Sequence, residues 1–149
     1  MKIKSKVLCL ISFVAFGAFA EEITTARFPD ADAVTVDEIE KVKYNSDGTY
    51  EQTDERWTKI LTERGRREES SMSLDYSQRY GEAKILFVKA IGTDGVEREI
   101  DVSKTTKEST DNGSMSANIY DPLDRKIVCT IPGLQVGETV LVLVEDKYW

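Results

Sequence analysis

The chain has 149 residues, 40% hydrophobic and 32% charged, which is long enough and apolar enough for one domain of ordinary size. Its formal charge of −7 disfavours binding to nucleic acid or to an anionic membrane surface, because like charges repel. The sequence contains no histidine, which excludes Ser-His-Asp or Cys-His catalysis and any His-ligated metal site within it.

Residues 1–20 have the organisation of a secretory signal peptide. Three lysines precede the apolar run Val7–Phe16, and the small-residue pattern Ala18-Phe19-Ala20 follows it. We predict cleavage after Ala20 and an exported mature chain, either periplasmic or extracellular, with a formal charge of −10. An uncleaved anchor is the alternative, but the run is shorter than the roughly 20 residues that cross a bilayer.

The stretch Val34–Leu61 predicts a long β-hairpin. Two β-rich runs flank the turn-forming cluster Asn45-Ser46-Asp47-Gly48. The alternation of apolar and polar residues changes phase within the first run, and a β-bulge around Asp37–Ile39 would explain the change. The polar middle of the second run indicates a sheet with one solvent-facing side.

A polar break, Thr62–Glu69, comes next, and Thr62 could cap one or two helical turns there. Its basic cluster, residues 64–67, is followed at once by Glu68 and Glu69, so we expect a solvated, self-paired segment rather than a binding patch. Later strands are predicted over residues 71–76, 82–91, 96–102, 126–131 and 138–144.

Two segments invite functional interpretation. Residues 103–118 are poor in apolar side chains and predict a long surface loop, either a flexible connector or a binding loop. The last predicted strand, Glu138–Val144, is apolar on both faces, and we expect it at an unfinished sheet edge that could pair with another chain.

These elements predict an all-β fold, an antiparallel β-sandwich of about seven strands that is incomplete at its C-terminal end. The turn signals are regularly spaced and no segment has the pattern of a crossover helix, which a parallel sheet would require. The domain organisation expected is a signal peptide over residues 1–20 and a truncated β-sandwich accessory domain over residues 21–149.

No catalytic, cofactor-binding or metal-ligating residue is predicted. Cys129 lies in a strand-like run and is expected to be a buried apolar residue, while Cys9 belongs to the leader. Asp30, Asp32 and Asp37 could offer oxygens to Ca²⁺, but their spacing matches no EF-hand loop. With 27 acidic residues, no particular pair can be singled out for glycoside hydrolysis.

The aromatic residues are the remaining candidates for a ligand site. Aromatic side chains in strands more often form the core or cross-strand pairs, but an exposed group could stack against a sugar. The residues concerned are Trp57, Tyr44, Tyr50, Phe87, Tyr120, Tyr148 and Trp149.

Several short motifs, in order, resemble a known family. They are the run from Phe28 to Val34, the turn Asp47-Gly48, the run from Trp57 to Gly65 (WTKILTERG), the run from Ala90 to Gly95, and the run from Ile131 to Glu138 (IPGLQVGE). This order is similar to the N-terminal β-sandwich domain of unknown function that precedes transglutaminase-like, papain-type domains in exported bacterial proteins.

The resemblance implies a non-catalytic accessory or scaffold domain. In such proteins the Cys-His-Asp domain follows further strands of the sandwich, and no position of this chain matches its catalytic residues. The implied partner is therefore a C-terminal transglutaminase-like or protease-like domain. The alternative is an independent envelope module that binds peptide or glycan.

Overall fold

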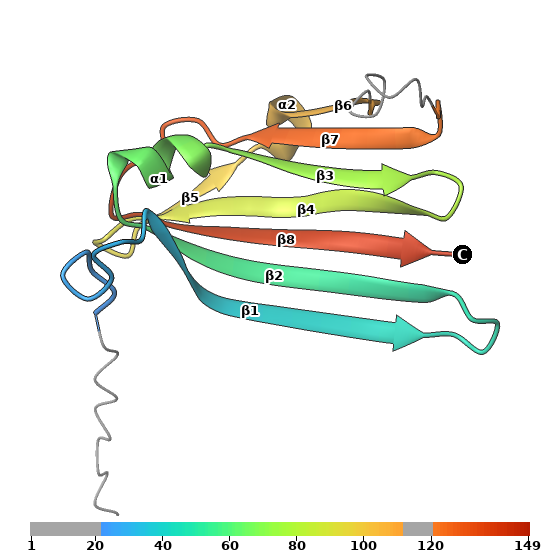
Figure 1. Ribbon diagram of the computed structural model, residues 1–149, viewed down its shortest axis with the longest axis horizontal. Coiled ribbons are helices and arrows are strands. Elements are labelled where there is room, and N and C mark those ends of the chain that lie inside the picture. Colours follow the sequence, from blue (N-terminus) through green and yellow to red (C-terminus); the bar gives the residue numbers. More distant parts are fainter. Residues whose placement is uncertain (1–21, 112–120) are drawn as a thin grey trace, which may run out of the picture.

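The computed structural model describes residues 22–111 and 121–149, so the predicted signal peptide lies outside the described residues (Figure 1). The described chain forms a five-stranded sheet in the order β1-β2-β8-β4-β5 and a three-stranded sheet in the order β3-β7-β6, both antiparallel. The prediction of an all-β sandwich is confirmed.

The bounds of the strands follow the prediction closely, except for β6, which was not predicted. The strands are β1 (Ala33–Tyr44), β2 (Tyr50–Ile60), β3 (Ser71–Ser77), β4 (Gly81–Ile91), β5 (Glu97–Ile100), β6 (Thr106–Thr110), β7 (Asp124–Thr130) and β8 (Thr139–Tyr148). Two short helices, α1 (Glu63–Glu68) and α2 (Val102–Thr105), connect strands. No helix among the described residues is long and apolar enough to cross a membrane.

β1 and β2 form the predicted hairpin. Gly48 has a φ of 90°, a conformation that favours glycine, and the Asp47 carboxylate accepts hydrogen bonds from the backbone N–H and hydroxyl of Thr49 at 3.0 and 2.8 Å. The register shifts between Thr35 and Asp37, so the bulge exists but starts earlier than predicted. Because one extra residue reverses the alternation of side chains, the shift explains the change of phase seen in the sequence of β1.

β8 lies at the centre of the five-stranded sheet, paired with β2 on one side and β4 on the other. The prediction that Glu138–Val144 forms a sheet edge is therefore wrong. Its apolar residues on both faces reflect this central position. Val140, Val142 and Val144 face the second sheet, and Leu141, on the opposite face, is only 6% exposed.

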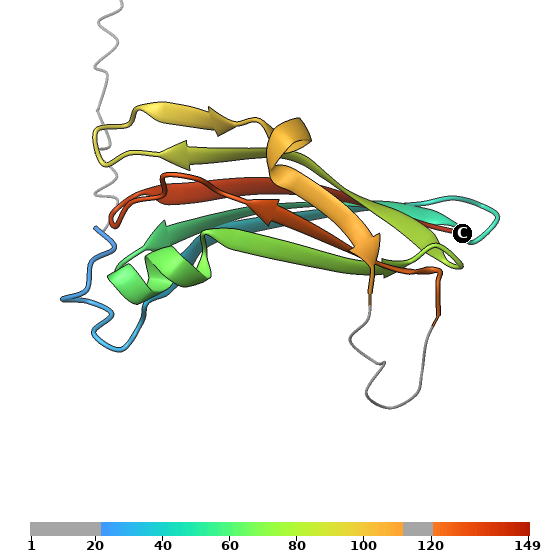
Figure 2. The same ribbon diagram turned by 90° about the horizontal axis from the view of Figure 1, so that it is seen from above.

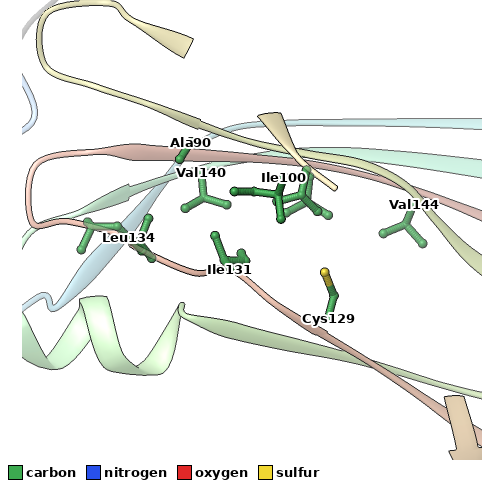
Figure 3. Packing of buried hydrophobic residues seen from close by; sticks show 10 residues of the cluster. Ala90, Ile100, Cys129, Ile131, Leu134, Val140 and Val144 are labelled. Atoms are coloured by element: carbon green, nitrogen blue, oxygen red, sulfur yellow. The ribbon is translucent and has the colours of Figure 1, made fainter. Parts of the chain in front are cut away.

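The core fills the space between the two sheets (Figure 3). Val88 and Ala90 of β4, Ile60 of β2 and Cys129 of β7 have no exposed surface. Removing such apolar side chains from water provides the main stabilisation of the sandwich, roughly 1.5–3 kcal/mol for each large side chain. The smaller sheet has three strands and the larger sheet has five, so part of the facing surface of the larger sheet stays uncovered.

The prediction of a surface loop over residues 103–118 is wrong for the first half of that segment. Residues 102–105 form α2, capped by the Asp101 side chain, which accepts a hydrogen bond from the N–H of Ser103 at 3.2 Å. Residues 106–110 then form β6, which pairs with β7. The polar side chains misled the prediction because an edge strand can be stabilised by backbone pairing alone. Residues 112–118 lie outside the described part of the chain.

One end of the sandwich, here termed the braced end, consists of residues 22–32, 61–70, 92–96 and 131–138 (Figure 1). Thr62 caps α1 as predicted, accepting a hydrogen bond from the N–H of Gly65 at 3.1 Å. The carbonyl of Asp32 accepts the N–H groups of Leu61 and Thr62 at 2.9 and 3.1 Å. A Cβ atom at Gly65 would lie 2.0 Å from that carbonyl oxygen, so only glycine fits there.

The run from Ile131 to Glu138 also belongs to the braced end. Leu134 is 2% exposed and inserts into the core, while Gly133 and Gly137 adopt φ values of 70° and 90°. Arg98 of β5 donates hydrogen bonds to the carbonyls of Pro132 and Gly133 at 2.8 and 3.2 Å. The turn is therefore a fixed structural connection between β7 and β8.

The opposite end, here termed the open end, consists of the β1–β2 turn, residues 78–80 and the C-terminal residues of β8 (Figure 1). On the outer face of the large sheet, Lys43, Glu51, Lys147 and Glu82 occupy one row across four strands. Lys43 lies 3.8 Å from Glu51, and Lys147 lies 3.9 Å from Glu82. Such exposed pairs keep this face in water but add little stability.

Candidate functional site

A cavity of about 510 Å³ opens between β4 and the second sheet. Its apolar lining comes from Ala83 and Ile85 of β4, Val102 of α2 and Ile127 of β7. Its polar lining includes Tyr76, Gln78, Ser103, Thr106 and Glu108. An apolar cleft with a few polar groups at its wall is the usual form of a binding site, so this cavity is the candidate site.

One wall of the cavity is the edge of a strand rather than the face of a sheet. Five consecutive residues, Glu82 to Leu86, line it. Successive side chains of a strand point to opposite faces, so a cavity above one face would be lined by alternate residues only. The backbone edge of β4 is therefore accessible from the cavity.

The second sheet forms the opposite wall, where a polar network is anchored on Glu108. The Tyr76 hydroxyl donates to Glu108 Oε1 at 2.8 Å, and Arg125 Nε donates to the same oxygen at 2.9 Å. The Tyr76 hydrogen bond, followed by that from Arg125, lowers the pKa of Glu108. Burial is the main cause that raises the pKa of Tyr76. The network fixes the shape of the wall with Glu108 ionised and Tyr76 neutral at pH 7.

Thr106 adds an unsatisfied group beside this network. Its hydroxyl oxygen is buried and has no hydrogen-bond partner among the described residues. Leaving a buried polar atom unpaired costs about 1–3 kcal/mol.

A second polar surface lies on the inner face of the large sheet, where Asp54 and Asp146 are diagonal neighbours on β2 and β8. Burial raises the pKa of Asp146, and the charges of Asp54 and Glu145 raise it further. Asp54 Oδ1 is buried and has no hydrogen-bond partner within residues 22–111 and 121–149. Asp54 borders a separate crevice of about 100 Å³ near Met72 and Leu74 of β3, outside the large cavity.

Three of the predicted aromatic residues meet at the open end. The Tyr50 and Tyr148 rings stack with centroids 4.4 Å apart, and Tyr44 lies 5.5 Å from Tyr50 at an angle of 42°. The rings thus turn faces toward each other, as in a cross-strand ladder, rather than presenting one flat platform for a sugar. The ladder serves first to hold β1, β2 and β8 together.

The other predicted aromatic residues are dispersed. Trp57 lies on the outer face of the large sheet, where its indole N–H donates to Glu55 at 2.9 Å. Phe87 lies 5.7 Å from the Lys89 ammonium, and Trp149 is 61% exposed. Tyr120 lies outside the described residues.

The charged residues considered as candidate binding or metal-ligating groups have partners within the domain. Arg64 pairs with Glu68 at 2.8 Å and Arg66 with Glu63 at 2.7 Å, so the predicted self-pairing of this segment is confirmed for these two arginines. Asp32 accepts a hydrogen bond from Thr62 rather than joining Asp37, which lies on β1. No group of three or more candidate metal ligands occurs among residues 22–111 and 121–149.

Cys129 is fully buried within the core, as predicted, and its sulfur lies 3.6 Å from the hydroxyl of Thr105.

Sequence reasoning missed the cavity residues Ile85, Val102, Thr106 and Ile127. One signal was available: a predicted strand of ten residues, 82–91, returns through a shorter one, 96–102, which leaves part of the longer strand without a partner.

The fold and the cleft define the class of this protein as an antiparallel β-sandwich domain. Within that class, residues 46–147 match the family described as "Domain of Unknown Function with solved-structure structure (DUF3857)". The chain belongs to this family, which confirms the resemblance to a domain of unknown function predicted from the sequence. A comparison with curated proteins gives no match.

Three solved structures are similar to the chain. One comes from Parabacteroides distasonis ATCC 8503 and is described as "a putative protease"; it has a TM-score of 0.68 and 16% identity. The match covers 79% of this chain but 23% of that chain, and at this identity it shows the fold alone.

The other two come from scaffoldin cipA of the Clostridium thermocellum cellulosome. The CBM3a-L domain with flanking linkers has a TM-score of 0.42 and 12% identity, covering 78% of this chain and 68% of that one. The family 3a carbohydrate binding module has a TM-score of 0.35 and 12% identity, covering 75% and 76%. These TM-scores are too low to support an argument about this chain.

The residues that carry the family resemblance concentrate at the braced end. Thr62 and Gly65 hold α1 against Asp32, and Gly133, Leu134 and Gly137 shape the turn before β8. Their roles are to fix backbone geometry and to fill the core. The cavity, by contrast, lies outside these motifs.

Proposed function

We propose that this chain is a non-catalytic accessory domain of an exported protein and acts beside a transglutaminase-like or protease-like domain. In this role the sandwich positions the catalytic domain or presents substrate to it. The chemistry belongs to the partner domain, because the sequence of this chain has no histidine and its cysteine beyond the leader is buried.

The observation that best supports this proposal is the partial coverage of the Parabacteroides distasonis protein. The fold of this chain accounts for 23% of a longer chain described as a putative protease. The order of family motifs over residues 28–138 adds support from the sequence. The localisation is part of the same proposal and depends on the leader, residues 1–20.

Two measurements test the accessory role. The purified chain should turn over no peptide or amide donor, and the coding sequence directly after codon 149 should specify Cys, His and Asp in papain-like order. Turnover by the isolated chain, or a stop codon after Trp149 in a stable secreted protein, would overturn the proposal. N-terminal sequencing of the exported protein should give Glu21 as its first residue.

A second candidate function is an independent envelope module that binds peptide or glycan. The cavity beside β4, with its accessible strand edge, is the observation that favours it. A glycan array and a panel of envelope peptides, applied to the same protein, separate the two ligand classes. Retention of neither class would remove this candidate.

A further inference from the structure

One half of β4 has an unpaired edge inside the larger sheet. β8 pairs with β4 along its whole length, from Gly81 to Ile91, whereas β5 pairs only with the segment from Val88 to Ile91. After Ile100 the chain leaves the sheet through α2 and crosses to β6 in the other sheet (Figure 2). The fifth strand position of the sheet is therefore filled beside residues 88–91 and open beside residues 81–87.

The large cavity coincides with this open position. Its lining by consecutive residues from Glu82 to Leu86 places it along the strand edge, and Thr106 and Glu108 lie on its far side. The pairing of β4 with β8 shifts register between Ile85 and Phe87, close to the point where the pairing of β4 with β5 ends. Leu86, which lies at this shift, is 41% exposed. An apolar side chain is thus available beside unpaired backbone groups.

We propose that this edge of β4, from Gly81 to Phe87, binds an extended segment of another polypeptide, which adds to the sheet as a strand in line with β5. An open edge presents alternating N–H and C=O groups, and an extended peptide backbone supplies the matching partners at the same spacing. A glycan has no such repeat. The inference is independent of the proposed accessory role.

The neighbouring side chains specify the pattern of the peptide. Its inward side chains lie opposite Ala83 and Ile85 and should be apolar, because they enter the part of the cavity lined by Val102 and Ile127. Its outward side chains lie opposite Glu82 and Lys84, so they should carry charges complementary to that pair. The ligand class is an extended peptide that alternates apolar and charged residues.

The two outer strands of the larger sheet, β1 and β5, are less suited to strand addition. β1 carries a bulge between Thr35 and Asp37, and the whole strand has five charged side chains; both features discourage pairing. β5 offers four residues, three of them charged. Consecutive strand residues line the large cavity only along β4, whereas the edge strands β3 and β6 of the smaller sheet contribute Tyr76 and the alternate residues Thr106 and Glu108.

The test uses fluorescently labelled ten-residue probes of alternating Val and Glu or alternating Val and Lys, titrated against the 149-residue chain. A twin of each probe carries N-methyl groups on alternate backbone amides, which removes the donors needed for pairing. We expect the twins to bind at least tenfold more weakly. Hydrogen exchange should show new protection at the edge-facing amides of residues 82–86.

A charge reversal locates the site without disturbing the fold. Lys84→Glu should raise the affinity for the Val-Lys probe relative to the Val-Glu probe by several-fold, because two acids then face the added strand. Lys41→Glu on β1 makes the same charge change and should leave the ratio unchanged. Circular dichroism checks that both variants fold.

Several results would overturn the proposal. These are equal binding of the N-methylated twins, protection at β1 or β3 instead of β4, and no binding of any probe at 1 mM. Concentration-dependent dimers with β4 protected in the absence of probe would assign the edge to a second copy of the chain, which also contradicts a foreign peptide.

Discussion

The two ends of this sandwich are stabilised in different ways. At the braced end, glycines, a buried leucine and backbone hydrogen bonds leave each residue little freedom, as at Gly65 and Leu134. At the open end, the strands project with exposed tyrosines such as Tyr44 and with surface charges such as Lys43 and Glu51. The difference indicates that the braced end maintains the fold, whereas the part nearer the open end is available for binding.

Among the variants that compare the two ends, truncation of Leu134 should have the largest effect on the free energy of unfolding. Leu134→Ala leaves a cavity under the turn and should lower the free energy of unfolding by about 3–4 kcal/mol, measured by chemical denaturation. Val136→Ala in the same turn is the control, because Val136 is 41% exposed, and it should cost less than about 0.5 kcal/mol. Equal losses would show that the turn is not anchored through Leu134.

The next largest effect is expected at Gly65. Gly65→Ala forces α1 away from the Asp32 carbonyl and should cost about 2–3 kcal/mol. Gly48→Ala at the open end has no atom within 4 Å of the new Cβ, so its cost of about 1 kcal/mol comes only from the positive φ. If Gly48→Ala were less stable than Gly65→Ala, the conclusion that the braced end maintains the fold would be wrong.

The tyrosine ladder should contribute less. Tyr50→Ala removes ring contacts with both Tyr44 and Tyr148 and should lower the free energy of unfolding by about 1–2 kcal/mol. Tyr44→Ala removes one contact from a residue that is 75% exposed and should cost about half as much. A loss at Tyr44 equal to that at Tyr50 would argue against a ladder centred on β2.

Asp146 should give the smallest effect, and it should be a gain. Burial and the charge of Asp54 raise the pKa of Asp146 in the folded state above its ordinary value of 3.8. The folded state therefore holds this proton more tightly than the unfolded state, and stability is lost as pH rises through the folded pKa. Asp146→Asn should increase the unfolding free energy at pH 7, and the gain should disappear below pH 3.8.

Exchange of an exposed carboxylate provides the control for this pH effect. Glu99→Gln on β5 removes the same charge from a position that is exposed to solvent. Urea titrations at pH 3.5 and pH 7 should show no comparable dependence for that variant. A gain for Asp146→Asn that persists unchanged at pH 3.5 would contradict the electrostatic explanation.

Local patterns predicted much of the fold correctly. The turn at Asn45–Gly48, the cap at Thr62 and the strands around Ile85 and Val128 depend on residues close together in sequence. The error at Glu138–Val144 has a physical cause: two apolar faces show that a strand is covered, but not which strands flank it. The polar segment 106–110 was misjudged because its backbone pairing with β7 leaves no trace in side-chain periodicity.

The sequence by itself determined the all-β class, the hairpins, the helix cap and the lack of imidazole chemistry, because each follows from residue identity and short-range spacing. Only the tertiary structure decided that β8 is central, that three tyrosines form a ladder and that half of β4 borders a cavity. These features depend on pairing between strands distant in the chain. Such pairing depends on the packing of the whole core, which no short stretch of sequence encodes.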